Sequence, residues 1–112
     1  MTTPNKVIEI VDRLKPNSYS EEDKLRWINE LDGMVQRLVI QQDDIVEYVF
    51  PDDMAKELLI PAPFDDVYAL FLEAKIDYHN REYGNYNNSA MMFEAQFSEY
   101  KKDYIRKHPA RG

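Results

Sequence analysis

The sequence contains no cysteine, only three glycines and no long apolar run. The absence of cysteine excludes disulfides, thiolate metal sites and cysteine nucleophiles. No apolar run approaches the roughly 20 residues that a membrane-spanning helix requires. Residues 1–14 also lack the apolar stretch of a secretion signal, so we expect a protein of the cytosol or of an assembly formed there.

Positive charge is in deficit as well, because 14 Lys and Arg residues face 21 Asp and Glu residues, for a formal net charge of −7. This balance argues against wrapping or gripping nucleic acid by charge. With 44% apolar and 31% charged residues, the 112-residue chain has the composition of one globular domain. We expect a single domain over residues 1–108 and a disordered tail over residues 109–112.

Six prolines and the hydrophobic periodicity divide the chain into helical stretches and one irregular middle. Thr3 before Pro4, Ser20 before three acids, and Asp65 are typical helix starts. The expected helices cover residues 4–14, 20–40, 65–83 and 88–107. The predicted fold class is therefore all-α, a single small bundle of about four helices.

The last two expected helices carry the clearest core pattern. Residues 85–89 have the composition of a turn and helix cap, which would separate these helices. Apolar residues recur at helical spacing on both sides of this turn. We expect six residues to pack between the two helices: Phe71, Leu72, Ile76, Phe93, Phe97 and Tyr100.

The middle segment, residues 42–64, is long for a connection in a compact domain and is rich in apolar residues. Residues 45–50 have β-branched and aromatic character, so they favour a short strand or an extended stretch. Part of the segment can fold back on the core, and exposed apolar residues would mark a partner site. The candidate assembly contacts are Val46, Tyr48, Val49 and Phe50, together with Trp27, which falls away from the main apolar stripe of its helix.

No group of residues has the pattern of a catalytic or cofactor site. The Glu-x-x-His pattern of helical di-iron sites is absent at His79, because position 76 is Ile. No serine stands in a glycine-flanked elbow, and the sequence has no phosphate-binding loop. We therefore expect no enzyme activity, no cofactor and no bound metal. The eight tyrosines are open to two interpretations, an aromatic core with phenol tips in water or an oligomer interface.

Several stretches of the chain resemble a family of small proteins from tailed phages and prophages of Gram-positive bacteria, encoded in the head-morphogenesis region. In the second half the similar stretches are Ile60-Pro61-Ala62-Pro63-Phe64-Asp65-Asp66-Val67-Tyr68, Tyr78-His79-Asn80-Arg81-Glu82-Tyr83 and Tyr86-Asn87-Asn88-Ser89. In the first half they are residues 8–17 and residues 20–33. The motifs are structural and mark no binding residue.

The resemblance implies an all-α head-tail connector, or head-completion, protein that forms a ring under the portal and docks the tail. It implies a homo-oligomer once assembled, with portal and tail proteins as partners and no sequence-specific nucleic acid or membrane. The implied location is the virion, and the host cytoplasm before assembly. The resemblance leaves open the number of copies in the ring. It also leaves open the oligomeric state of the free protein, for which a monomer is one of the options.

An acidic phage effector that binds a host protein, as a DNA mimic, is the alternative function. A DNA mimic needs dense acids on one face, whereas the 14 basic residues are interspersed among the acids here. The genomic neighbourhood distinguishes the two: capsid and portal genes favour the connector, and early genes favour the effector.

Overall fold

A computed structural model describes residues 1–109 of the chain and shows helices joined by turns and one long non-helical segment. The elements are α1 (Pro4–Leu14), α2 (Glu21–Met34), the π-helix η1 (Val35–Ile40), α3 (Asp66–His79) and α4 (Tyr83–Lys107). Residues 1–109 contain no strand, so the predicted all-α fold class is confirmed. The prediction of a disordered tail concerns residues 109–112, of which 110–112 lie outside the described residues.

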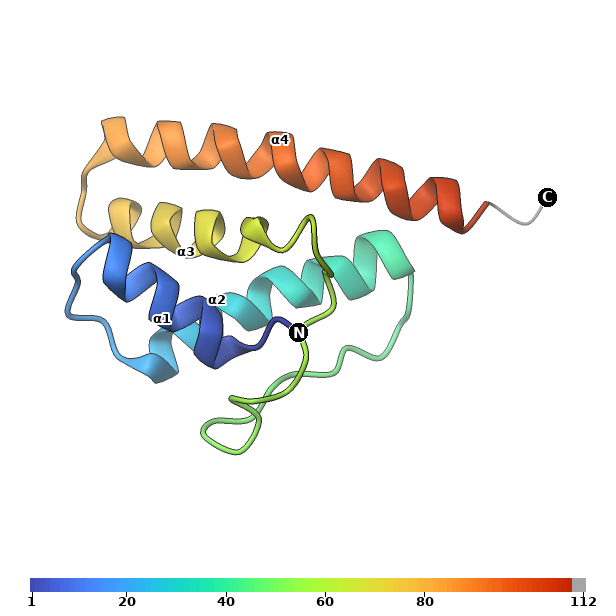
Figure 1. The fold of residues 1–112 in the computed structure, drawn as a ribbon, viewed down its shortest axis with the longest axis horizontal. Coiled ribbons are helices and arrows are strands. Elements are labelled where there is room, and N and C mark those ends of the chain that lie inside the picture. Colours follow the sequence, from blue (N-terminus) through green and yellow to red (C-terminus); the bar gives the residue numbers. More distant parts are fainter. Residues whose placement is uncertain (110–112) are drawn as a thin grey trace.

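Helix α3 forms the central layer of the molecule. Figure 1 shows α4 lying along one side of α3, with α1 and α2 on the other side. Contacts join α3 to each of the other three α-helices, whereas α4 contacts only α3 and η1 among the helices. The side chains of α3 are accordingly the most enclosed, with Val67, Tyr68, Leu72 and Ile76 fully buried. No helix in this part of the chain is long and apolar enough to cross a membrane.

The first two helices begin at the residues that the sequence predicts. Thr3 Oγ1 accepts a hydrogen bond from the Lys6 N–H at 3.3 Å, and Ser20 Oγ accepts one from the Asp23 N–H at 3.1 Å. Asp65 behaves differently, because its side chain caps no backbone N–H of α3. Its carboxylate accepts the Thr2 hydroxyl instead, which ties the start of α3 to the N-terminus.

The connection between α3 and α4 is shorter than predicted. Helix α4 begins at Tyr83, so the prediction that residues 85–89 form a turn is wrong. The chain reverses instead around Arg81, which has a φ of 62°. The rings of Tyr83 and Tyr86 lie 6.4 and 5.6 Å from that of Tyr78 on α3. These aromatic contacts stabilise the helical start and outweigh the local turn preference of the asparagines.

The predicted aromatic contact between α3 and α4 is confirmed. The ring of Phe71 on α3 lies 5.2 Å from that of Phe93, which stacks at 5.4 Å on Phe97. Phe71 is partly buried, and Phe93 and Phe97 are buried. The other three residues of the predicted set are also buried: Leu72, Ile76 and Tyr100.

Part of the middle segment folds back onto the core. Met54, Leu58 and Ile60 are buried in the same cluster as the helix residues. Backbone hydrogen bonds join this part to the N-terminus, from the Asn5 N–H to the Met54 oxygen at 3.0 Å and from the Leu58 N–H to the Thr2 oxygen at 2.8 Å. The second half of the segment is therefore a structural part of the folded domain.

Candidate assembly surface

One polar stripe on α2 and η1 holds the first half of the middle segment. The stripe consists of Asn29, Asp32 and Gln36, whose spacings of three and four residues place them on one side of the helix. Each of these side chains bonds to the extended stretch around residues 46–48. The stripe therefore takes the place that a neighbouring strand would have in a sheet.

Two carboxamides of this stripe pair with the backbone of alternate residues. Asn29 Nδ2 donates to the Tyr48 oxygen at 3.0 Å, and Asn29 Oδ1 accepts from the Tyr48 N–H at 2.8 Å. Gln36 Nε2 donates to the Val46 oxygen at 2.9 Å, and Gln36 Oε1 accepts from the Val46 N–H at 2.8 Å. Alternate residues present their backbone groups to the same edge of an extended chain. This explains why residues 45–50 have a strand-like sequence without being part of a sheet.

Asp32, between the two carboxamides, is the buried centre of the attachment and is only 1% exposed. Its Oδ1 accepts the Tyr68 hydroxyl at 2.6 Å, and its Oδ2 accepts the Tyr48 hydroxyl at 2.5 Å and the Leu59 N–H at 3.3 Å. The Tyr68 oxygen in turn accepts the Ile60 N–H at 2.8 Å. This carboxylate thus joins α2, α3 and both halves of the middle segment.

The protonation of this network follows from its burial. Burial raises the pKa of the Asp32 carboxyl above its ordinary value, and the hydrogen bonds from Tyr48, Tyr68 and Leu59 oppose that change. Burial and the neighbouring Asp32 carboxyl raise the pKa of both Tyr48 and Tyr68 far above that of a free phenol. Both hydroxyls therefore stay protonated and able to donate at neutral pH. The arrangement suits anchoring, because these groups bond to one another inside the molecule.

Three of the candidate contact residues on the attached stretch are exposed. Val46 is 67% exposed, Val49 57% and Phe50 40%, whereas Tyr48 is half-buried and points inward to Asp32. We call the exposed residues of this stretch the outer face: Asp43, Asp44, Val46, Glu47, Val49 and Phe50. The structure thus brings Val46, Val49 and Phe50 onto one firmly attached segment and uses Tyr48 as its anchor.

Trp27 lies apart from the outer face, inside the helical bundle. Its indole is only 3% exposed and stacks on the ring of His79 at 5.5 Å, with the edge of Tyr19 at 5.4 Å. It packs at the contact between α2 and α3. The side chain of Trp27 therefore has almost no exposed surface through which to contact a partner in this conformation.

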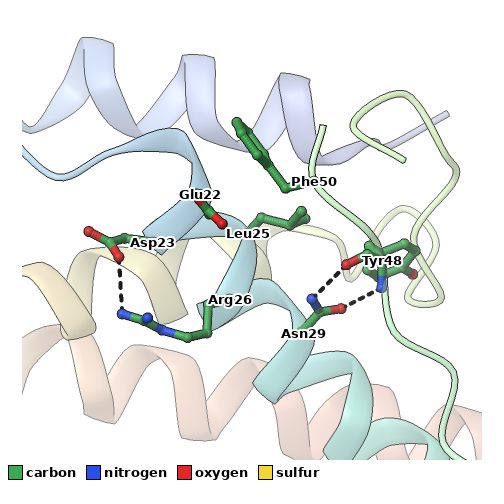
Figure 2. Close-up of a pocket in the computed structure, with 7 residues that line it drawn as sticks. All are labelled: Glu22, Asp23, Leu25, Arg26, Asn29, Tyr48 and Phe50. Atoms are coloured by element: carbon green, nitrogen blue, oxygen red, sulfur yellow. Dashed lines mark hydrogen bonds and ion pairs between the residues drawn. The ribbon is translucent and has the colours of Figure 1, made fainter. Parts of the chain in front are cut away.

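A groove lies between the first half of α2 and the outer face. Its volume is about 450 Å³, and Figure 2 shows Phe50 beside Leu25, Arg26 reaching toward Asp23, and Asn29 joined to the backbone of Tyr48. Glu22 also lines the groove. Arg26 pairs with Asp23 at 3.1 Å, so the only base in the lining is engaged by a neighbouring acid. The groove extends the exposed surface beside Phe50 and holds no arrangement of nucleophile and base.

A second apolar surface lies at the turn between α3 and α4, and the sequence pattern does not locate it. Tyr78 and Tyr83 are exposed there, beside a hollow of about 370 Å³ that Tyr86 and Phe93 help to line. The abundance of tyrosine in the sequence indicates such a surface, but the asparagines of residues 85–89 favour a turn at this place. Two other tyrosines, Tyr68 and Tyr100, are buried in the core.

The chain matches no family model, and the searches of curated proteins and of solved structures find no match either. Within residues 1–109, no three His, Asp or Glu side chains gather closely enough to hold a metal ion.

Proposed function

We propose that this protein is a structural subunit of tailed-phage particles, a head-tail connector or head-completion protein that forms a ring under the portal and docks the tail. The observation that supports it is the exposure of Val46, Val49 and Phe50 on a segment that Asn29 and Asp32 attach to α2. Apolar groups that are held in place and exposed are typical of a surface with a partner. The resemblance to small phage head-morphogenesis proteins supports the same function independently.

The shape and charge of the subunit are compatible with a ring. Identical subunits that meet head to tail need two different surfaces, since each surface binds the other one on the next copy. The outer face and α4 lie on opposite sides of α3 in Figure 1, which leaves both available. A net charge of −7 also suits a ring through which DNA passes without being held.

The test of this function is the composition of the particle. We expect the protein in purified virions, in a copy number that fits one ring per particle, and we expect loss of its gene to give DNA-filled heads without tails. Quantitative mass spectrometry of purified particles measures the copy number. Particles that lack the protein and are still infectious would contradict the proposal.

One observation favours the alternative, an acidic effector that binds a host protein. Five acids occur in residues 43–53, and no base lies between Arg37 and Lys56. Such an effector would be made early in infection, would be absent from the particle, and would be recovered from infected cells with a host protein. The same purified virions and a time course of expression therefore distinguish the two functions.

A further inference from the structure

The C-terminal end of α4 extends beyond the rest of the bundle. Helix α4 has 25 residues and its partner α3 has 14, and Figure 1 shows the last turns of α4 projecting past α3. The middle segment begins at the end of η1, which contacts α4, and only its tip loops out on the side away from α4 (Figure 1). Within residues 1–109 no ion pair joins the last two turns of α4 to the middle segment, so the charges of both are free to meet another copy.

This end of α4 carries one exposed apolar side chain among bases. Ile105 is 64% exposed, and four exposed basic residues surround it in the last two turns: Lys101, Lys102, Arg106 and Lys107. Lys102, Arg106 and Lys107 pair with acids of their own helix at 3.2 to 3.7 Å, and such exposed pairs contribute little free energy and exchange readily. Residues 99–107 contain four bases and two acids, so this end remains positive.

The outer face of the middle segment has the opposite composition. Val46 is its most exposed apolar side chain, and Asp43, Asp44 and Glu47 lie on either side of it. None of these three acids takes part in an ion pair within residues 1–109. Each surface thus combines an exposed aliphatic residue with charge of one sign, and the signs differ.

We propose that the C-terminal end of α4 of one copy docks on the outer face of the middle segment of the next copy. Ile105 meets Val46 and Val49, and the bases around it face Asp43, Asp44 and Glu47. Complementary charge fixes the register of such a contact and disfavours the alternative of like surfaces meeting. The contact is head to tail, so it adds copies in one direction and closes into a ring when the rotation between subunits allows it.

The inference rests on the proposed function in one respect, which is that identical copies must contact one another. It names the two surfaces that make this contact. A second copy is the occupant because the chain itself supplies both complementary surfaces. A basic segment of another protein is the competing occupant. Association of the purified protein separates the two, since no other protein is present in the sample.

The experiment uses paired charge reversals in the full-length protein. One variant carries Lys101→Glu and Arg106→Glu, and the other carries Asp43→Lys and Glu47→Lys. All four side chains are exposed, so both variants should keep the circular dichroism spectrum of the wild type. Glu9→Lys with Glu94→Lys is the matched control, because these exposed acids lie on α1 and α4 away from both surfaces and give the same change in net charge as the second variant.

Sedimentation velocity at low salt over a range of concentrations is the readout. We expect the wild type and the control to associate as concentration rises, each reversal variant alone to stay monomeric, and an equimolar mixture of the two variants to associate again. The mixture recovers because the reversed end of one variant fits the reversed face of the other. A carbodiimide, which joins lysine to carboxylate without a spacer, should link Lys101 to Asp43 or Glu47 of another copy.

Three results would overturn the inference: a wild type that stays monomeric and forms no such cross-link, a mixture that stays monomeric although the wild type associates, or a control that loses association too. These results leave the proposed function standing if the protein is found in particles. Recovery of association by the mixture, with no protein in particles, would contradict the proposed function and leave the contact in place.

Discussion

The residue on which the position of the middle segment depends most is Asp32. Its carboxylate is the acceptor for two phenol hydroxyls and one backbone N–H, all of them inside the subunit. Within residues 1–109 no buried side-chain polar atom lacks a hydrogen-bond partner, so this network is complete. A complete network of this kind stabilises one arrangement of the segment, since each partner removed leaves another buried group unpaired.

Removing the carboxylate should destabilise the protein strongly. Asp32→Ala leaves the hydroxyls of Tyr48 and Tyr68 and the Leu59 N–H without their acceptor, and we expect it to lower the free energy of unfolding by about 3 kcal/mol. Asp32→Asn keeps one acceptor oxygen and should cost less. Urea denaturation at neutral pH measures both. An Asp32→Ala protein as stable as the wild type would show that the network does not hold the segment.

The two buried phenols predict sensitivity to alkali. The pKa values of Tyr48 and Tyr68 are raised in the folded state, so above about pH 10, where free phenols ionise, the folded state binds more protons than the unfolded state. Stability from these groups is therefore complete below about pH 10 and is lost as the pH rises further. Tyr100 contributes in the same direction, because burial raises its pKa to about 12.

Denaturation curves at a series of pH values test this dependence. The free energy of unfolding of the wild type should fall steeply above about pH 10. Tyr68→Phe should be less stable at neutral pH but should show a shallower fall, whereas Tyr83→Phe, at an exposed position, should keep the slope of the wild type. If Tyr68→Phe followed the wild-type slope, ionisation of the buried phenol would not be the cause.

At the scale of elements, α2 and η1 make different contacts on two of their sides. One side carries the apolar residues that the periodicity identifies, with Leu31 and Val35 fully buried against the core. The other side carries the polar stripe, which attaches the middle segment. The last residues of the predicted helix over 20–40 wind as the π-helix η1, and Gln36 within it reaches Val46.

The attachment by carboxamides is testable by hydrogen exchange. Asn29→Ala removes the acceptor of the Tyr48 N–H, so the amide of Tyr48 should exchange faster by roughly tenfold, the effect of about 1.4 kcal/mol, while α3 amides keep their protection. Arg26→Ala, one turn earlier on an exposed side of α2, is the control and should leave the Tyr48 amide unchanged. Equal exchange in the Asn29 variant and the wild type would contradict the attachment.

Gly33 offers a stabilising substitution in the same element. A methyl group there would lie 3.8 Å from Ile45 Cγ2, an ordinary van der Waals contact, and the φ of Gly33 is not positive. Gly33→Ala should therefore raise the free energy of unfolding by about 1 kcal/mol, the usual difference between glycine and alanine in a helix. Thermal and urea denaturation measure the gain. A loss of stability would mean that Ile45 has no room to adjust.

The sequence predicted the helices better than it predicted how the middle segment is attached to α2 and η1. Periodic apolar residues located the helices and the packing of Phe93 and Phe97, because burial of one face decides both. The polar stripe was visible as Asn29, Asp32 and Gln36 at helical spacing, but its partner could not be identified from spacing, since it lies in the distant backbone of Val46 and Tyr48.

The misplaced start of α4 has a similar cause. Asparagine favours turns through local hydrogen bonds, which is a property of short stretches of sequence. The contact of Tyr83 and Tyr86 with Tyr78 depends instead on how α3 and α4 lie against each other, which local pattern does not contain. For the same reason Trp27 was expected at the surface, although its stacking partner His79 lies on another helix.

At the scale of the whole molecule, the protein divides into a helical bundle and an attached segment with an exposed face. The bundle buries its aromatic residues between α3 and α4, whereas the outer face leaves Val49 and Phe50 in contact with solvent. Exposed residues contribute little to folding, so a change there should affect assembly far more than stability. This difference separates a contact surface from a part of the core.

The most direct test of the outer face as an assembly contact is the incorporation of a Val49→Ser, Phe50→Ser double variant into phage particles. The free subunit should keep its helical circular dichroism spectrum and lose only about 1 kcal/mol of stability. Its copy number in purified particles, compared with that of the wild type by mass spectrometry, should fall to near zero and leave filled heads without tails. A folded variant that enters particles at the wild-type copy number would contradict the contact, and a variant that unfolds as a free subunit would place Val49 and Phe50 in the core.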